Sequence, residues 1–159
     1  MELQRQFEIA LQIISAMLLG GIIGYEREKD GKAAGIRTYA AVCMGSCIFT
    51  LIGVHLMDAD GTSRMVSNII TGIGFLGAGI IFKDTSTNKT RGLTTAATIW
   101  ATAAVGVAVG YLLYAIAIIS SCAIYFLLSV HHFKWFVQWT KKLREKHEQK
   151  HKDEPHDDE

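Results

Sequence analysis

The chain has 159 residues, of which 50% are hydrophobic and 19% are charged, and its formal net charge is +1. Glycine is frequent at 15 residues, whereas the single proline, Pro155, lies near the C-terminus. Asp, Glu, Lys and Arg are absent from three long stretches, 38–57, 65–82 and 92–133. Uncharged apolar runs of about 18 residues or more are candidate transmembrane helices. The composition therefore excludes an ordinary soluble domain and predicts an all-α, polytopic membrane helical bundle.

Five transmembrane helices are predicted, over residues 7–25, 36–57, 65–82, 93–109 and 111–130. With a rise of about 1.5 Å per residue, each run is close to the ~30 Å thickness of the bilayer hydrocarbon. Residues 1–130 are therefore expected to form one five-span transmembrane domain. A cleaved signal peptide is the alternative for the first run, but Glu2 and Glu8 dilute the positive charge that such a peptide carries at its start.

The positive residues between and after these runs predict the orientation. The first connection, the third connection and the segment after the fifth run hold four, three and seven Lys or Arg residues, 14 in all. The opposite side has only Arg5 and Arg64. Because cytoplasmic segments of membrane proteins are enriched in Lys and Arg, the N-terminus is predicted outside and the C-terminus in the cytoplasm.

The third run contains "TGIGFLGAGIIF", in which Gly72, Gly74 and Gly77 match the spelling of a dinucleotide-binding fingerprint. That fingerprint requires a preceding strand, an opening helix and an acidic residue about 20 residues later, and no such acid is present. On a helix, the glycines instead fall on two roughly opposite faces. Small residues let membrane helices approach closely, so this run is expected to be a central helix contacted from both sides, or one that leaves a thin gap for an ion or water. The glycines expected at helix contacts are Gly20, Gly24, Gly72, Gly74, Gly77, Gly79, Gly106 and Gly110.

Polar residues within the runs allow two interpretations. Tyr39, Cys43, Ser46 and Thr50 repeat at helical spacing in the second run. This stripe either packs tightly or lines a polar pathway between the second, third and fourth runs. Asn68 is the most polar residue of the third run and is a candidate for a site at membrane depth; an interhelical hydrogen bond is its alternative role.

Three segments carry a family resemblance. "GGIIGYEREKDGKAAGIRT", "TGIGFLGAGIIF" and "TRGLTTAATIWATAAVG" resemble, in order, the signature segments of the MgtC/SapB family of bacterial inner-membrane proteins. The resemblance implies five spans and an association with magnesium limitation. Proteins of this family are often named as magnesium transporters, whereas some members look more like regulators of membrane machines such as the ATP synthase. Many members also carry a ferredoxin-like C-terminal domain, for which the 29 residues after Val130 are too few.

Charged residues near the predicted membrane edge supply candidate chemistry. Such groups are costly in the membrane unless they are paired, although snorkelling arginines in a solvated loop are an alternative. Glu26, Glu28 and Asp84 are the candidate Mg²⁺ ligands, because this ion prefers oxygen ligands and takes one or two carboxylates; salt bridges among the same groups are the competing interpretation. The family pattern adds weight to Glu26, Arg27 and Arg37. The functional candidates are Glu26, Arg27, Arg37, Asn68, Asp84, Arg91, Thr94, Thr95 and Trp100.

Residues 131–159 are expected to form a juxtamembrane amphipathic helix and a charged cytoplasmic tail, with Trp135, Phe136 and Trp139 at the lipid interface. No Walker loop and no pairing of nucleophile and base is found in the sequence, so no enzymatic activity is expected. Two functions are carried forward. The first is Mg²⁺ homeostasis through transport or sensing of the cation by the bundle, and the second is regulation without transport by docking on another membrane complex. Lipids, a second copy of the chain and a membrane-protein partner are the expected partners, and nucleic acid is not.

Overall fold

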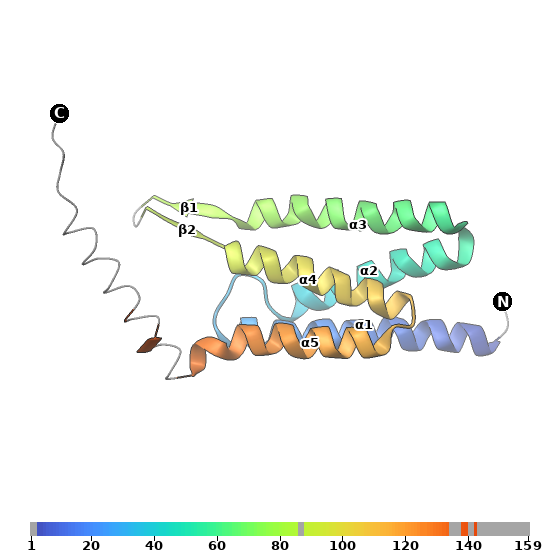
Figure 1. Ribbon diagram of the computed structural model, residues 1–159, viewed down its shortest axis with the longest axis horizontal. Coiled ribbons are helices and arrows are strands. Elements are labelled where there is room, and N and C mark those ends of the chain that lie inside the picture. Colours follow the sequence, from blue (N-terminus) through green and yellow to red (C-terminus); the bar gives the residue numbers. More distant parts are fainter. Residues whose placement is uncertain (1–2, 86–87, 134–137, 140–141, 143–159) are drawn as a thin grey trace, which may run out of the picture. The chain divides into compact units, whose positions relative to one another are not determined.

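The computed structural model describes residues 3–85, 88–133, 138–139 and 142. The described residues form five α-helices, a two-stranded hairpin and a short 3₁₀ helix (Figure 1). In chain order the elements are α1 (Leu3–Lys29), α2 (Ile36–Leu56), α3 (Ala59–Ile80), β1 (Phe82–Asp84), β2 (Lys89–Arg91), α4 (Leu93–Gly110), α5 (Tyr114–Ser129) and η1 (Val130–His132). The predicted all-α helical bundle is confirmed.

Within the described residues, α1, α2 and α4 are long and apolar enough to cross a membrane. The helix α5 is apolar but has only 16 residues. The helix α3 is long enough, with 22 residues, but its first turns contain the polar sequence "ADGTSR". The five predicted helices are present, and their passage through the membrane with the N-terminus outside stays a prediction.

Two helix ends differ from the sequence-based prediction. The helix α1 continues to Lys29, so Glu26 and Arg27 lie in its last turn rather than in a loop. The helix α3 begins at Ala59, because the Asp58 carboxylate accepts a hydrogen bond of 2.7 Å from the amide of Gly61. An aspartate at this N-cap position satisfies an amide that the helix itself cannot pair.

The inner helices of the bundle are α2 and α4, each of which packs against α1, against α3 and against the other. Tyr39 of α2 and Ile99 of α4 are among the largest fully buried side chains. By contrast, Gly61, Thr62 and Gly77 are the buried residues of α3. The expectation that the glycine-rich α3 is a central helix contacted from both sides is therefore wrong within this chain.

Glycines form the closest contacts between the inner helices and their neighbours. A Cβ atom at Gly20 would lie 2.5 Å from the carbonyl oxygen of Tyr39, and one at Gly24 would lie 2.7 Å from Cα of Ile36. A Cβ atom at Gly106 would collide with the carbonyl oxygen of Cys43. These positions set the distances from α1 to α2 and from α4 to α2, since only glycine leaves room for the facing backbone.

The other predicted packing glycines behave differently. A Cβ atom at Gly110 would lie 2.6 Å from Cβ of Thr50, so this residue also touches α2. Gly77 of α3 makes an ordinary contact, 3.5 Å from Cβ of Ala96. No atom lies within 4 Å of the Cβ positions of the remaining three, which are Gly72, Gly74 and Gly79. Sequence periodicity located the small faces of α3 but could not show that no described part of the bundle packs closely on these three glycines.

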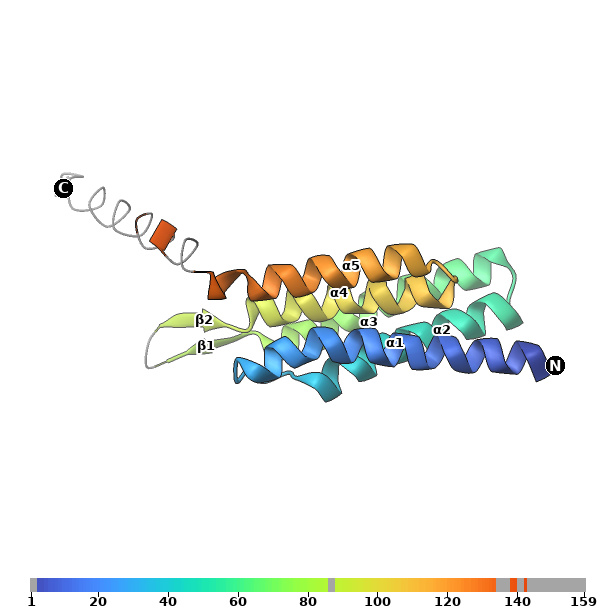
Figure 2. The same ribbon diagram turned by 90° about the horizontal axis from the view of Figure 1, so that it is seen from below.

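The α1–α2 connection and the β1–β2 hairpin lie at one end of the bundle, called here the hairpin end (Figures 1 and 2). The α2–α3 and α4–α5 connections lie at the opposite end. The basic residues of the first and third connections therefore occupy the same end, as the predicted orientation requires.

The chain divides into two compact units, Met1–Tyr125 and Phe126–Glu159, and α5 passes from the first into the second. In the first unit, α5 buries Ala117, Ser121 and Ile124. In the second unit, the ring centroids of Phe126 and Phe133 are 6.4 Å apart. Most of the predicted juxtamembrane segment, including Trp135 and Phe136, lies outside the described residues, although Trp139 is described and is exposed.

Candidate functional site

Two charged side chains are buried at the hairpin end of α1. Glu26 is 1% exposed and Arg27 is 5% exposed, and these are the charged members of the buried set within the described part of the chain. Burying a charge is costly unless it is paired and hydrogen-bonded. Their position therefore requires specific neighbours, and it marks this end of α1 as the candidate functional site.

Arg27 joins three helices at this end. Its Nη2 atom donates a hydrogen bond of 2.7 Å to Oγ1 of Thr95, in the first turn of α4. The hydroxyl of Tyr39, from α2, lies 2.6 Å from Oγ1 of Thr98, and Thr98 donates in turn to the carbonyl of Thr94 at 2.9 Å. Arg27, Tyr39, Thr95 and Thr98 form the Arg27 cluster, which fixes α1, α2 and α4 to one another.

Glu26 lies beside this cluster in sequence, and its carboxylate is 3.9 Å from Nζ of Lys29. The lysine side chain is 55% exposed, so the pair extends from the interior to the surface. A carboxylate in the last turn of a helix is also opposed by the negative end of the helix dipole. Glu26 is nevertheless held in the interior at the hairpin end beside Arg27, and its functional role stays a prediction.

Glu28 has a structural role that the sequence did not reveal. Its Oε2 atom accepts a hydrogen bond of 2.8 Å from the amide of Ile36, the first residue of α2. The N-cap residue Gly35 supplies no side-chain bond of its own. Glu28, Lys32, Arg37 and Thr38 also line an open pocket of about 440 Å³ at this end.

Asp84 and Arg91 form an ion pair across the hairpin, with Oδ2 and Nη2 3.1 Å apart. They belong to the antiparallel strands β1 and β2. Gly92 follows with φ 90°, a left-handed conformation that favours glycine, and α4 begins after it. The two candidates are thus used to close the connection between α3 and α4.

The predicted three-carboxylate metal site is not formed by the described residues. No group of three or more His, Cys, Asp or Glu side chains able to hold a metal ion occurs in this part of the chain. The reason is local, since Glu28 caps α2 and Asp84 pairs with Arg91. The sequence placed these carboxylates near one end of the bundle but did not show that nearby elements would engage them.

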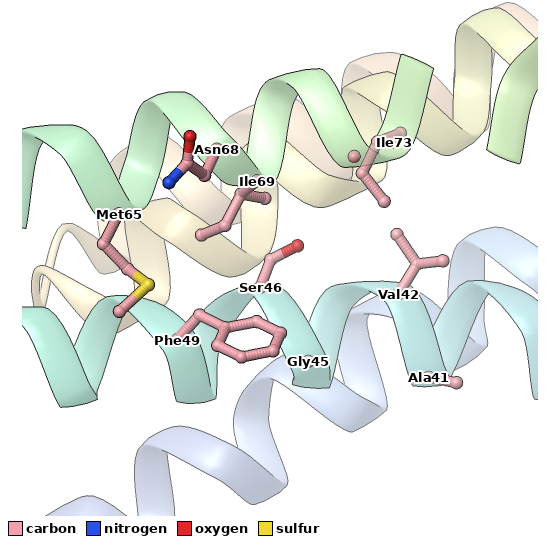
Figure 3. Close-up of a pocket in the computed structure, with 10 residues that line it drawn as sticks. Ala41, Val42, Gly45, Ser46, Phe49, Met65, Asn68, Ile69 and Ile73 are labelled. Atoms are coloured by element: carbon pink, nitrogen blue, oxygen red, sulfur yellow. The ribbon is translucent and has the colours of Figure 1, made fainter. Parts of the chain in front are cut away.

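The side chains of the remaining candidates are not part of the Arg27 cluster. Thr94 is exposed beside it. Trp100 is 52% exposed and lines a cavity of about 150 Å³ between α3 and α4. Asn68 is exposed on α3 and lines a larger cavity of about 380 Å³ between α2 and α3 (Figure 3).

The polar stripe of α2 packs mainly on α4. Gly106 lies against the carbonyl of Cys43 and the Cβ of Ser46, and Gly110 lies against Thr50. Thr50 donates to the carbonyl of Ser46 at 2.8 Å within its own helix. The contacts of this stripe with α4 therefore agree with tight packing rather than with a polar pathway between α2 and α4.

The sequence did not predict that Gln12 caps a helix. This residue is 3% exposed, and its Nε2 atom lies 2.9 Å from the carbonyl oxygen of Val109 and 3.2 Å from that of Gly110. Carbonyls in the last turn of a helix such as α4 lack amide partners within the helix. That of Val109 also accepts a bond of 2.9 Å from the Leu112 amide. An amide side chain inside an otherwise apolar run was the signal that could have identified this cap.

Comparison with known proteins places the chain in a family. The family model described as MgtC family matches residues 13–134. The chain is 36% identical to Protein SrpB of Synechococcus elongatus over 138 residues, which cover 79% of this chain and 75% of that protein. It is 45% identical to Protein MgtC of Brucella abortus over 98 residues, 62% of this chain and 40% of that protein. It is 42% identical to Protein MgtC of Salmonella typhimurium over 104 residues, 65% of this chain and 44% of that protein.

The aligned region thus covers less than half of the length of these MgtC proteins. No solved structure matches the chain. The family match and the apolar helices agree with the resemblance carried by the three signature segments. The chain is a membrane protein that belongs to the MgtC family.

Proposed function

We propose that the chain supports Mg²⁺ homeostasis in the bacterial inner membrane as a regulator that docks on another membrane complex and does not itself transport the cation. The observation that carries this proposal is the closure of the polar stripe of α2 by α4. A cation crossing the bundle along this stripe would have to pass Gly106, which lies against the backbone of Cys43, and Gly110, which lies against the side chain of Thr50.

Charge placement supports the same proposal. Ion and proton pathways through membranes are usually marked by ionisable residues at membrane depth. Among the described residues, the buried charged side chains are Glu26 and Arg27, both in the last turn of α1. The middle of the bundle therefore offers a cation no charged ligand from this part of the chain.

The outer face of α3 is the proposed docking surface. Gly74 and Gly79 have no atom of the described residues within 4 Å of an added Cβ outside their own helix backbone, and Phe75 between them is 86% exposed. Small residues on an uncovered helix allow another membrane helix to approach closely. A complex such as the ATP synthase, which the family resemblance suggests, is a candidate partner, and a second copy of the chain is another. We expect no enzymatic activity.

Cation transport or sensing is the second candidate, and the position of Glu26 favours it. Glu26 places a carboxylate at the predicted cytoplasmic end, and carboxylate oxygens are the ligands that divalent cations such as Mg²⁺ take. Under this alternative, Glu26 acts directly on the ion, whereas under the regulatory proposal it stabilises the end of the bundle.

Growth at limiting Mg²⁺ separates the two candidate functions. The Gly74→Leu and Glu26→Gln variants are each expressed in a bacterial strain from which the gene for this protein has been deleted. A leucine at Gly74 has room in the chain, so the protein should fold but lose its support of growth because the docking face is blocked. Ala115→Leu, at an exposed position of α5, is the matched control and should support growth. Full support by Gly74→Leu, at equal membrane levels and with loss in Glu26→Gln, would contradict the regulatory proposal.

A further inference from the structure

A cavity of about 380 Å³ lies between α2 and α3 (Figure 3). Its walls are mostly apolar and include Val42, Phe49, Met65 and Ile69. This volume is within the range of small-molecule sites, which are usually apolar with a few polar groups that orient the ligand. The polar side chains of this cavity are Ser46 on α2 and Asn68 on α3.

Ser46 is an exception among the buried hydroxyl residues. Thr50, Thr102 and Ser121 each donate a hydrogen bond of 2.8 Å to the carbonyl four residues earlier. The hydroxyl of Ser46 makes no hydrogen bond with any residue that the structure describes, although Ser46 is only 3% exposed. Its side chain extends from α2 toward α3 (Figure 3). Its oxygen is open to the cavity rather than enclosed by protein, so the hydroxyl is available to bond a polar group of a ligand that enters there.

Asn68 supplies the second polar group from the facing helix. Its amide also makes no hydrogen bond with the described residues. A hydroxyl and an amide each offer both a donor and an acceptor. Either can bond a hydroxyl or carbonyl group of a molecule whose remaining body lies against the apolar walls.

Depth limits the identity of that molecule. Ser46 lies ten residues from either end of α2, which is about 15 Å at 1.5 Å per residue. A phospholipid keeps its ester groups at the interface, so it could bring only hydrocarbon to this depth. The cavity has no charged lining residue, and an ion would lose its hydration without compensation. The ligand must therefore be neutral and free to place a polar group at mid-membrane.

We propose that the α2–α3 cavity binds a neutral, membrane-soluble amphiphile whose hydroxyl or carbonyl group bonds Ser46, with Asn68 as the second polar group of the cavity wall (Figure 3). The site is separate from the Arg27 cluster and from the outer face of α3 used in the proposed docking. The amphiphile would enter the cavity between α2 and α3. Its binding would not require any ion to cross the bundle.

The test uses the full chain in lipid vesicles and a photoreactive octanol that carries a diazirine on its alkyl chain. Labelling is expected on Phe49, Met65 or Ile69, and it should saturate and be competed by octanol but not by octane. Ser46→Ala combined with Asn68→Ala should weaken the apparent affinity roughly tenfold, as loss of such hydrogen bonds does. The control Ser121→Ala removes a hydroxyl that is already bonded to its own helix and should leave labelling unchanged.

A second variant guards against misfolding as an explanation. Gly45 lines the cavity and has no atom within 4 Å of an added Cβ, so Gly45→Leu should fill the space and abolish labelling in a folded protein. Labelling that does not saturate, or that persists in Gly45→Leu, would overturn the proposal. Equal labelling by a diazirine octane would show that a hydrocarbon chain alone occupies the cavity. If the Asn68→Cys variant forms a disulfide between two copies of the chain and labelling is then lost, a second copy occupies the cavity instead. Either of these last two results would contradict the proposal.

Discussion

Arg27 connects the last turn of α1 to the first turn of α4, where its Nη2 atom donates a hydrogen bond of 2.7 Å to Oγ1 of Thr95. Both residues are buried. The two belong to separate signature segments of the sequence, and the structure brings them together at the hairpin end. The shared contact gives a physical reason why both segments are needed to build one site.

Thr95→Val tests this contact. The substitution keeps the shape of the side chain but removes the acceptor for a buried guanidinium, so we expect the free energy of unfolding to fall by about 1–3 kcal/mol. The measurement is the thermal unfolding of the purified chain in detergent micelles. Thr94→Val is the matched control, because Thr94 is the exposed neighbour and should change the unfolding midpoint little. Equal destabilisation by both variants would show that the hydrogen bond is not the cause.

Gln12→Leu tests the cap on α4. Loss of the amide removes the side-chain donor to the carbonyls of Val109 and Gly110, although Val109 keeps its bond from the Leu112 amide, and we expect a loss of about 1 kcal/mol. Hydrogen exchange should become faster in a peptide covering residues 108–113. Gln4→Leu, at an exposed position near the start of α1, should leave exchange there unaltered. Unchanged protection in Gln12→Leu would rule out the cap.

Gly106→Ala tests the contact between the inner helices. A methyl group at this position collides with the carbonyl of Cys43, and overpacking of this kind costs about 1–3 kcal/mol. Gly79→Ala is the control, because its Cβ has open space and alanine favours a helix by about 1 kcal/mol over glycine. Thermal unfolding should therefore shift down in Gly106→Ala and stay level or rise in Gly79→Ala. A lower midpoint in Gly79→Ala alone would reverse the assignment of inner and outer faces.

Glu28→Ala tests the cap on α2. The amide of Ile36 loses its acceptor, so the first turn of α2 should fray and exchange amide hydrogens faster. Lys32→Ala, in the same connection and also lining the nearby pocket, should not have this effect. Slow exchange in Glu28→Ala would mean that another group satisfies the helix start.

The helices could be predicted from the sequence because uncharged runs and their flanking charges are local signals. Helix ends were harder to predict from the sequence. The helix α3 begins early because Asp58 caps it, and α1 continues far enough that Glu26 and Arg27 lie in its last turn. The spacing of Gly72, Gly74 and Gly79 identified small faces, but only the packing shows that these faces are uncovered in the chain. The pairing of Arg27 with Thr95 depends on residues 68 positions apart, which spacing alone cannot predict.

The most direct test of the regulatory proposal is Mg²⁺ flux into liposomes that contain the purified, folded chain and an internal magnesium dye. Because α2 and α4 close the polar stripe at Gly106 and Gly110, the proposal predicts no flux above that of empty liposomes. Saturable Mg²⁺ entry that is lost in Glu26→Gln but kept in a Glu148→Gln control would contradict it.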